Sequence, residues 1–399
     1  MQLHRPADCA DEGLLGQSLL GMRIVVVGGA GEVGAALVRD LAHAEDIDSL
    51  LVADVNEDRA AAIAADVNDR RVGACGLDVH DRESALELLE GANVLMNCTS
   101  FSLFDTVFDL AVEAGVDYAD LISEPSERQR VAAERAGITA ISGLGASPGL
   151  SNVLVRHAAE QFDELLAVNI SWVSSRTAAP TPGLLDTILW EVSEGCSTRS
   201  FFRDGRHERA EFLEGSRIVD FAQPVGRQFV YYVPHPEVRT LPAHFPTLQE
   251  CAVRGTWRPE LMQDMFVLQR YGLLSPAALR STKQAIWERL GGARDGSPWL
   301  LYVNVEVIGA RGGDLVRRTY NVSHPPAWGE QGMGRMTGIS AAVGAHLLAR
   351  NGRTSVGFVD PEEYYEPADF LAHLERRGGI DIECDECVTV PGRSQPATA

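Results

Sequence analysis

Short apolar runs alternate with amphipathic stretches over the first third of the chain, from Met22 to about Ile141. Short runs without polar positions are typical of strands buried on both faces, as in a parallel sheet covered by helices. Phe104, Val107 and Ala111 stand at helical spacing, which predicts a helix with one face toward the sheet. The strands are expected at residues 24–27, 49–53, 73–77, 93–97, 118–122 and 138–142, with helices between them. This alternation predicts an α/β fold with a doubly wound parallel sheet.

The pattern changes after Phe162, where longer strand-like stretches replace the short alternation. They cover residues 166–173, 217–221, 229–233 and 300–308, and Asp204–Gly205 gives a strong hairpin signal. We expect an inserted, largely antiparallel α+β domain here, and a small-residue helix at 337–349 that returns to the first domain. The expected parts are an N-terminal extension (1–21), a first domain (22–161), a second domain (162–325), a C-terminal segment packing on the first domain (326–390) and a polar tail (391–399).

Glycines spaced as Gly29-x-Gly31-x-x-Gly34 follow directly after the first apolar run. This spacing permits a tight turn, a close approach of the backbone to a pyrophosphate, and close packing of the next helix on its strand. Asp54 ends the second expected strand, 20 residues beyond Gly34, where a carboxylate can bind the adenosine ribose. The motif predicts a Rossmann dinucleotide site that prefers NAD to NADP. Three further residues of the turn are expected at the cofactor: Ala30, Glu32 and Val33.

The ends of the next strands complete the expected cofactor crevice, because ligands bind at the carboxyl ends of parallel strands. Asp78 and Val79 would flank the adenine, and Asn97, Cys98 and Thr99 would pass beside the nicotinamide half. Residues of these types also serve as helix caps and turn residues, and that alternative stays open for the acidic ones.

Composition narrows the possible partners. The formal net charge of −21 at pH 7 argues against nucleic acid or an anionic membrane surface, and no apolar run approaches the roughly 18 residues of a membrane span. Seven cysteines scattered along the chain fit a reducing compartment, so we expect a cytoplasmic protein. No constellation with metal-ligand spacing is evident, and no metal is expected.

Longer segments are more specific than the glycine pattern. They include GVDYADL, GLGASPGLSN, HPEVRTLP and MTGISAAVGAHLLARNG. With these segments in this order, the chain resembles the saccharopine dehydrogenase-like family, particularly its lysine 6-dehydrogenase and carboxynorspermidine dehydrogenase relatives. The resemblance implies a Rossmann domain, an inserted substrate domain through which a homodimer forms, and hydride exchange at a carbon that bears nitrogen. Ser147 stands where the saccharopine reductase branch has Asp, which disfavours saccharopine itself as the substrate.

The leading hypothesis is therefore an NAD-dependent oxidoreductase that acts on a CH–N bond of a small-molecule amino acid, by oxidative deamination or reductive condensation. Asp120, at the end of the fifth expected strand, is the candidate for orienting or deprotonating the substrate amine. The alternative is a non-catalytic dinucleotide-binding protein that senses redox state, because a fold does not define a function. The expected substrate contacts are Glu124, Ser147, Arg227, His235 and Glu237.

Overall fold

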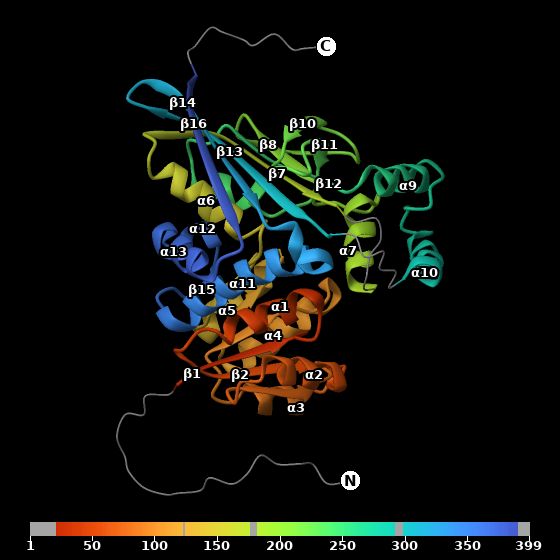
Figure 1. The fold of residues 1–399 in the computed structure, drawn as a ribbon, viewed down its shortest axis with the longest axis vertical. Helices are drawn as coiled ribbons and strands as arrows, with labels where there is room; N and C mark the ends of the chain where they lie inside the picture. The colour runs from red at the N-terminus through yellow and green to blue at the C-terminus, as the bar shows by residue number, and fades with distance from the viewer. Residues whose placement is uncertain (1–20, 123, 176–181, 292–297, 390–399) are drawn as a thin grey trace, which may run out of the picture.

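The computed structural model describes residues 21–122, 124–175, 182–291 and 298–389. The predicted polar tail and all but Gly21 of the predicted N-terminal extension lie outside the described residues. Two sheets, one above the other in Figure 1, form the framework, with helices between and around them.

The first sheet has seven strands in the order β15-β6-β5-β4-β1-β2-β3, and every pair is parallel. The prediction of a doubly wound parallel sheet is confirmed. Only six strands were expected; the seventh, β15, has three residues, too few for a recognisable pattern, and comes from the C-terminal segment. The strands are β1 (Met22–Val27), β2 (Ile47–Asp54), β3 (Val72–Gly76), β4 (Val94–Asn97), β5 (Asp117–Asp120), β6 (Thr139–Ile141) and β15 (Gly357–Val359).

Helices cover both faces of this sheet, which explains the absence of polar positions in β1. Ile24 and Val26 pack in one core with α1, α2 and α11, whereas Val25 and Val27 pack in a second core with α3, α4 and α5. The helices are α1 (Glu32–Leu41), α2 (Glu57–Val67), α3 (Arg82–Leu89), α4 (Phe104–Ala114), preceded by the 3-10 turn η1 (Phe101–Leu103), α5 (Glu127–Ala136) and α11 (Gly332–Asn351), preceded by the 3-10 turn η2 (Pro326–Gln331).

The second sheet follows the order β10-β11-β12-β7-β13-β14-β16, and the hairpin β8–β9 pairs beside β12. The turn of this hairpin is Asp204–Gly205, as predicted, with positive φ angles at both residues. The sheet is largely antiparallel, as expected. It is mixed at one place, because β12 runs parallel to its central neighbour β7. The strands are β7 (Glu164–Ser174), β8 (Ser200–Arg203), β9 (Arg206–Arg209), β10 (Arg217–Asp220), β11 (Arg227–Tyr232), β12 (Glu250–Thr256), β13 (Leu301–Arg311), β14 (Asp314–Ser323) and β16 (Asp381–Thr389).

The C-terminal segment is divided between the two sheets. β15 joins the first sheet, as described above, but β16 pairs along its whole length with β14 of the second sheet. The remaining helices are α6 (Leu150–Ala159), α7 (Pro182–Val192), α8 (Glu237–His244), α9 (Pro259–Arg270), α10 (Leu279–Leu290), α12 (Pro361–Tyr364) and α13 (Pro367–Arg377).

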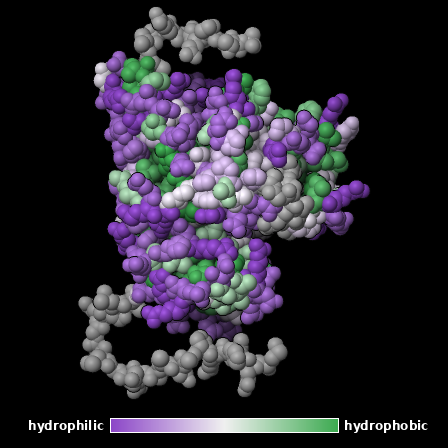
Figure 2. Space-filling view, in the orientation of Figure 1, coloured by the Kyte–Doolittle hydropathy of each residue, from purple (hydrophilic) through white to green (hydrophobic). Residues whose placement is uncertain are grey.

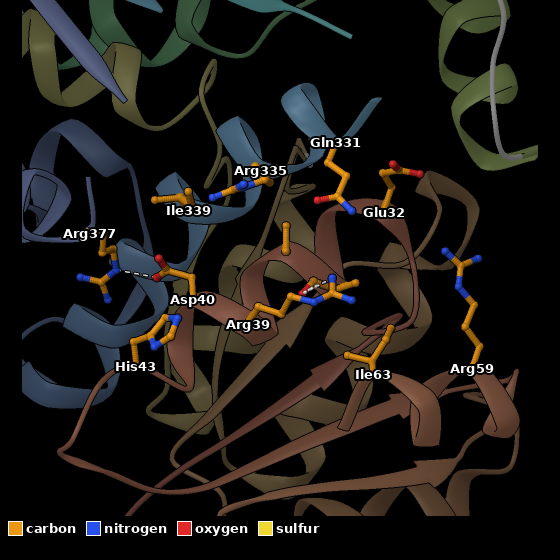
Figure 3. A pocket seen from close by; sticks show the side chains of 12 residues that line it. Glu32, Arg39, Asp40, His43, Arg59, Ile63, Gln331, Arg335, Ile339 and Arg377 are labelled. Atoms are coloured by element: carbon orange, nitrogen blue, oxygen red, sulfur yellow. Dashed lines mark hydrogen bonds and ion pairs between the residues drawn. The ribbon is translucent and has the colours of Figure 1, made fainter. Parts of the chain in front are cut away.

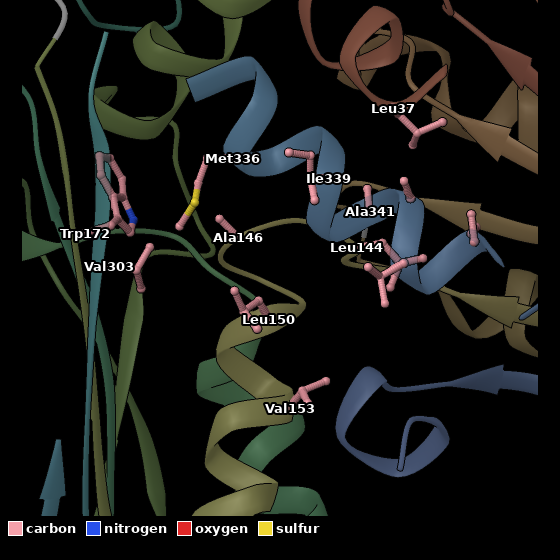
Figure 4. Close-up of a cluster of buried hydrophobic side chains, with 14 of the residues drawn as sticks. Leu37, Leu144, Ala146, Leu150, Val153, Trp172, Val303, Met336, Ile339 and Ala341 are labelled. Atoms are coloured by element: carbon pink, nitrogen blue, oxygen red, sulfur yellow. The ribbon is translucent and has the colours of Figure 1, made fainter. Parts of the chain in front are cut away.

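One continuous hydrophobic core joins the two sheets. Leu150 of α6, Trp172 of β7 and Met336 of α11 belong to the same cluster of buried side chains, and Figure 4 shows α11 passing through it. The pair α9–α10 instead projects to one side in Figure 2 and exposes apolar side chains, among them Phe266 and Val267. The fold thus places the carboxyl edge of the first sheet directly below the second domain (Figure 1).

Candidate active site

The glycine turn after β1 has the close packing that the motif predicts. Gly31 is the N-cap of α1, and a Cβ atom on Gly34 would lie 2.5 Å from the carbonyl oxygen of Gly28. Gly28 itself has a φ of +75°, and a Cβ there would lie 2.7 Å from the backbone of Cys98. Only residues without a side chain fit this cradle, which leaves the first N–H groups of α1, at Glu32 and Val33, beside the turn. The cradle therefore fits the pyrophosphate of a dinucleotide.

Asp54 lies at this turn, as its position at the end of β2 predicts. Its carboxylate accepts hydrogen bonds from the backbone N–H groups of Ala30 and Asn56, both at 3.0 Å. After β3, the exposed Asp78 accepts a hydrogen bond from the N–H of His80 at 2.9 Å, and Val79 is buried in the core. Asp54 and Asp78 are thus acidic groups at the end of the edge where the adenosine is expected.

The segment after β4 is held by a buried asparagine. Asn97 donates a hydrogen bond to the hydroxyl of Tyr118 at 3.0 Å and accepts one from the hydroxyl of Thr99 at 2.7 Å. Burial, with a smaller contribution from Asp120, raises the pKa of the Cys98 thiol to about 12, so this thiol is neutral. Asn97 therefore orders the turn that borders the expected nicotinamide position.

Asp120 is enclosed in the same edge, with no exposed surface. Its carboxylate accepts hydrogen bonds from the hydroxyl of Ser142 at 2.9 Å and the N–H of Gly143 at 3.3 Å. Its backbone carbonyl accepts a further bond from Leu144 N–H at 2.8 Å. In this conformation Asp120 holds the loop that follows β6, and its predicted role with the substrate amine stays a prediction.

The second domain contributes a buried pair of titratable side chains above this loop. His235 and Glu237 are 6% and 0% exposed, and His235 Nδ1 lies 3.3 Å from Glu237 Oε2. The other oxygen of Glu237 accepts hydrogen bonds from the hydroxyls of Ser147 at 2.7 Å and Ser151 at 3.0 Å. The structure therefore brings together three residues that the sequence singled out separately: Ser147, His235 and Glu237.

A third acidic residue, Glu191 of α7, lies in the same region and was not among the predicted site residues. It is 7% exposed, and burial raises its pKa to about 7, although His235 and Arg199 act in the opposite direction. For His235, burial works to lower the pKa, but Glu237 and Glu191 outweigh it and the pKa is raised. The sequence feature that could have identified Glu191 as a site residue is a carboxylate within the largely apolar stretch 184–192.

Several buried polar atoms in this region have no hydrogen-bond partner within the described residues. They include Glu191 Oε2 and the indole Nε1 of Trp172. Among the residues that the structure describes, His235 Nδ1 and Glu237 Oε2 have only each other as partners, at 3.3 Å. The Trp172 ring lies 6.0 Å from the imidazole of His235, so an aromatic wall borders the acidic groups. Buried polar groups are almost always satisfied, and their clustering here indicates a site for a polar ligand.

Two contacts connect the second domain to the cofactor edge. Phe101, just after β4, stacks on Trp190 of α7 with ring centroids 5.3 Å apart, one residue from Glu191. Glu124, which follows β5, forms an ion pair with Arg239 of α8. Arg227 does not join this group: it is exposed at the start of β11, opposite Asp220 in the β10–β11 pair. Helix α7 is thus seated next to the expected nicotinamide position.

Two models of known protein families match this chain, one after the other along the sequence. The saccharopine dehydrogenase NADP binding domain matches residues 24–141, and the saccharopine dehydrogenase C-terminal domain matches residues 145–380. The chain belongs to the saccharopine dehydrogenase family. The resemblance stated from the sequence is therefore confirmed, and the family supports an oxidoreductase with a nicotinamide dinucleotide cofactor.

The individual proteins that this chain resembles are distant from it in sequence. Carboxyaminopropylagmatine dehydrogenase from Synechocystis sp. is 23% identical over 387 residues, which cover 90% of this chain and 96% of that protein. Saccharopine dehydrogenase (L-Glu forming) from Saccharomyces cerevisiae is 15% identical, covers 92% of this chain and 100% of that one, and superposes with a TM-score of 0.69. Homospermidine synthase from Legionella pneumophila, in complex with NAD, is 13% identical, with 94% of both chains covered and a TM-score of 0.59.

Two kinds of feature are absent from the described residues. No group of three or more His, Cys, Asp and Glu side chains is placed to hold a metal ion in the part of the chain that the structure describes. Across that same part, no helix is long and apolar enough to cross a membrane.

Glu362 of α12 extends the buried polar group away from the cofactor edge. It has no exposed surface, and Oε2 accepts a hydrogen bond from Asn152 at 2.8 Å. Burial and the neighbouring Asp360 raise its pKa to about 8, and Oε1 has no hydrogen-bond partner within the described residues. Glu362 is therefore mostly protonated at neutral pH.

The raised pKa of Glu362 makes stability depend on pH. Protonated Glu362 contributes fully to the free energy of unfolding below the unfolded-state pKa of 4.5. This contribution is lost as the pH rises through the folded-state pKa of about 8. Glu362→Gln mimics the protonated acid at every pH. We expect the difference in free energy of unfolding between this variant and the wild type to increase by roughly 2–3 kcal/mol from pH 6 to pH 8. Chemical unfolding of both proteins at a series of pH values measures this difference. A difference that does not change with pH would contradict the assignment.

Proposed function

We propose that this chain transfers hydride between NAD(H) and a carbon that bears nitrogen, in a cationic amine or in the imine derived from it. The observation that carries this proposal is the buried group of Glu191, His235 and Glu237, which lies beside Ser147 at the carboxyl edge of the first sheet. The unpartnered Oε2 of Glu191 is a position that an N–H group of an ammonium substrate would satisfy.

The chemistry requires a group that changes its protonation state near neutral pH. When bound, the nicotinamide ring supplies the acceptor or donor of hydride, and Gly29, Gly31 and Gly34 would hold its pyrophosphate. In the direction of oxidation the substrate ammonium must first lose a proton, after which the carbon–nitrogen bond becomes an iminium as hydride leaves. Glu191, with a pKa of about 7, is the group that we assign to accept this proton.

The remaining residues of the group orient the substrate and exclude water. Glu237 is fixed by two hydroxyl donors, Ser147 and Ser151, so its second oxygen has a defined direction, toward His235. The Trp172 ring borders His235 on one side, and Phe101 of the first domain stacks on Trp190 of the second. Exclusion of water strengthens the electrostatic attraction of the carboxylates for a cationic substrate.

The name of the Synechocystis relative guides the choice of substrate. It combines a carboxyaminopropyl group with agmatine, which is a cationic amine. We therefore assign to this chain a substrate that joins an amino-acid part to a second amine, with the oxidised or reduced carbon next to the nitrogen between them. Lysine, which the sequence resemblance suggests, is the simpler alternative: its reacting carbon also bears nitrogen, but as a primary amine.

The pH profile tests the role of Glu191. Because its pKa is about 7 in the free enzyme, kcat/KM for amine oxidation is expected to rise with pH through about 7 as the carboxylate becomes able to accept a proton. Glu191→Gln should remove this acidic limb from the residual activity. A profile in which the limb keeps its position in the variant would assign it to another group.

The preference for NAD over NADP is a separate prediction. Asp54 lies at the glycine turn with its carboxylate held by Ala30 and Asn56, so a 2′-phosphate there would face a fixed negative charge. We expect kcat/KM to be at least about tenfold higher with NAD, which corresponds to about 1.4 kcal/mol. Steady-state kinetics with both cofactors measures the ratio, and comparable efficiencies would rule the preference out.

A further inference from the structure

A cationic groove lies on the first domain, on the outer side of α1. It encloses about 470 Å³ between α1, α2, α11 and α13, and Figure 3 shows side chains from these helices around it. Five of the lining side chains are basic: Arg39, His43, Arg59, Arg335 and Arg377. The lining acids are only Glu32 and Asp40, in a chain whose net charge is −21. The groove is therefore more basic than the chain as a whole.

One of the two acids is already neutralised within the groove. Asp40 and Arg377 form a buried ion pair, with Asp40 Oδ2 lying 2.5 Å from Arg377 Nε. Arg39 pairs with Asp66 at 2.9 Å, but both side chains are largely exposed, and such a pair is weak in water. The groove thus keeps an excess of positive charge at Arg39, Arg59 and Arg335.

Arg335 is held in place so that its charge faces this groove. Its guanidinium lies 4.2 Å from the centroid of the Trp328 ring, a cation–π contact that restricts its position. Burial and the like charge of Arg39 lower the pKa of Arg335, while Asp40 acts in the opposite direction. Arg39 and Arg335 therefore repel each other across the groove, and a bound anion would relieve that repulsion.

We propose that this groove binds a phosphate-bearing anion of about the size of a nucleotide. Planar guanidinium groups recognise phosphate oxygens in pairs, and the volume lies within the range of small-molecule sites. The groove begins beside the dinucleotide cradle, at Glu32, and extends away from it along α1. Arg39 lies eight residues, or about 12 Å of helix, beyond Gly31. A ligand here would bridge α1, which carries the glycine turn, and α11.

Isothermal titration of the full chain, saturated with NADH, with inorganic triphosphate tests the proposal. We expect binding with a Kd below about 1 mM. The double variant Arg39→Gln, Arg335→Gln should weaken it at least about tenfold, since two charge-assisted contacts are lost. Arg128→Gln is the matched control, because Arg128 is exposed on α5 and pairs only with Asp109 among the described residues. The control should bind like the wild type.

Titration with and without NADH shows which site the triphosphate occupies. If it binds in the groove, saturation of the cofactor cleft with NADH leaves its affinity unchanged. Displacement of triphosphate by NADH would place the anion in the cofactor cleft and overturn the proposal. Absence of binding, or equal binding by the double variant, would overturn it as well, and thermal unfolding of that variant shows whether it is folded.

Discussion

Replacing Glu191 with Gln is expected to lower kcat about 10²–10⁴-fold, the usual loss when a general base is removed, and to leave NADH affinity unchanged. Gln keeps the volume of Glu191 but cannot accept a proton, and the cofactor turn lies on a different domain. Turnover with the best amine substrate and NADH binding by fluorescence measure the two effects. Glu194→Gln is the matched control, because Glu194 is exposed three residues further along the chain. Near wild-type turnover in Glu191→Gln would move the proton transfer to another residue.

Asp120→Asn distinguishes the proton-accepting role of Glu191 from the role that the sequence predicts for Asp120. Its carboxylate accepts bonds from Ser142 and Gly143, so an amide in its place would disturb the loop before Ser147. We expect lower turnover, but with the acidic limb of the pH profile still present, as befits a positioning residue. Loss of the limb in Asp120→Asn alone would instead make Asp120 the proton acceptor.

Gly338→Val is expected to lower the free energy of unfolding by more than about 3 kcal/mol, because overpacking a rigid contact forces the backbone to move. A Cβ atom on Gly338 would lie 2.8 Å from the Cβ of Ala36 and 2.9 Å from the backbone nitrogen of Leu37. Neither atom can rotate away, so α11 would separate from α1. Since α1 carries the glycine turn, NADH affinity should fall together with stability.

The control for this substitution is Ala349→Val on the same helix. Ala349 is only half-buried, near the end of α11, and the change introduces the same β-branched side chain. Chemical unfolding of the three proteins gives the comparison. Equal stability of Gly338→Val and the control would show that the helices tolerate separation at this contact.

The local pattern of the chain was sufficient for six of the seven strands of the first sheet. The apolar run of β1, the glycines at Gly29, Gly31 and Gly34, and the position of Asp54 are all features of neighbouring residues, and the structure places them as the pattern predicts. The hairpin at Asp204–Gly205 follows from the backbone freedom of those two residues in the same way. These features were predictable because each depends only on residues that are close together in the sequence.

The features that the sequence did not reveal depend on distant pairings. The parallel pairing of β12 with β7, and the joining of β16 to β14, connect segments whose separation along the chain leaves no local signature. Glu191 is an ordinary helix residue until α7 is seated beside His235. Arg227, in contrast, was chosen for its charge alone, and the structure leaves it exposed at the start of β11, outside the group.

Transfer of deuterium tests the central claim most directly. Imines formed from amine and carbonyl pairs, with one pair chosen to yield carboxyaminopropylagmatine, are reduced with NADH that carries deuterium at its transferable position, and the product is examined by mass spectrometry. The account predicts one deuterium on the carbon next to nitrogen, at a rate that falls in Glu191→Gln. Tight binding of NADH without deuterium in any product would contradict it and would favour the non-catalytic redox-sensing alternative.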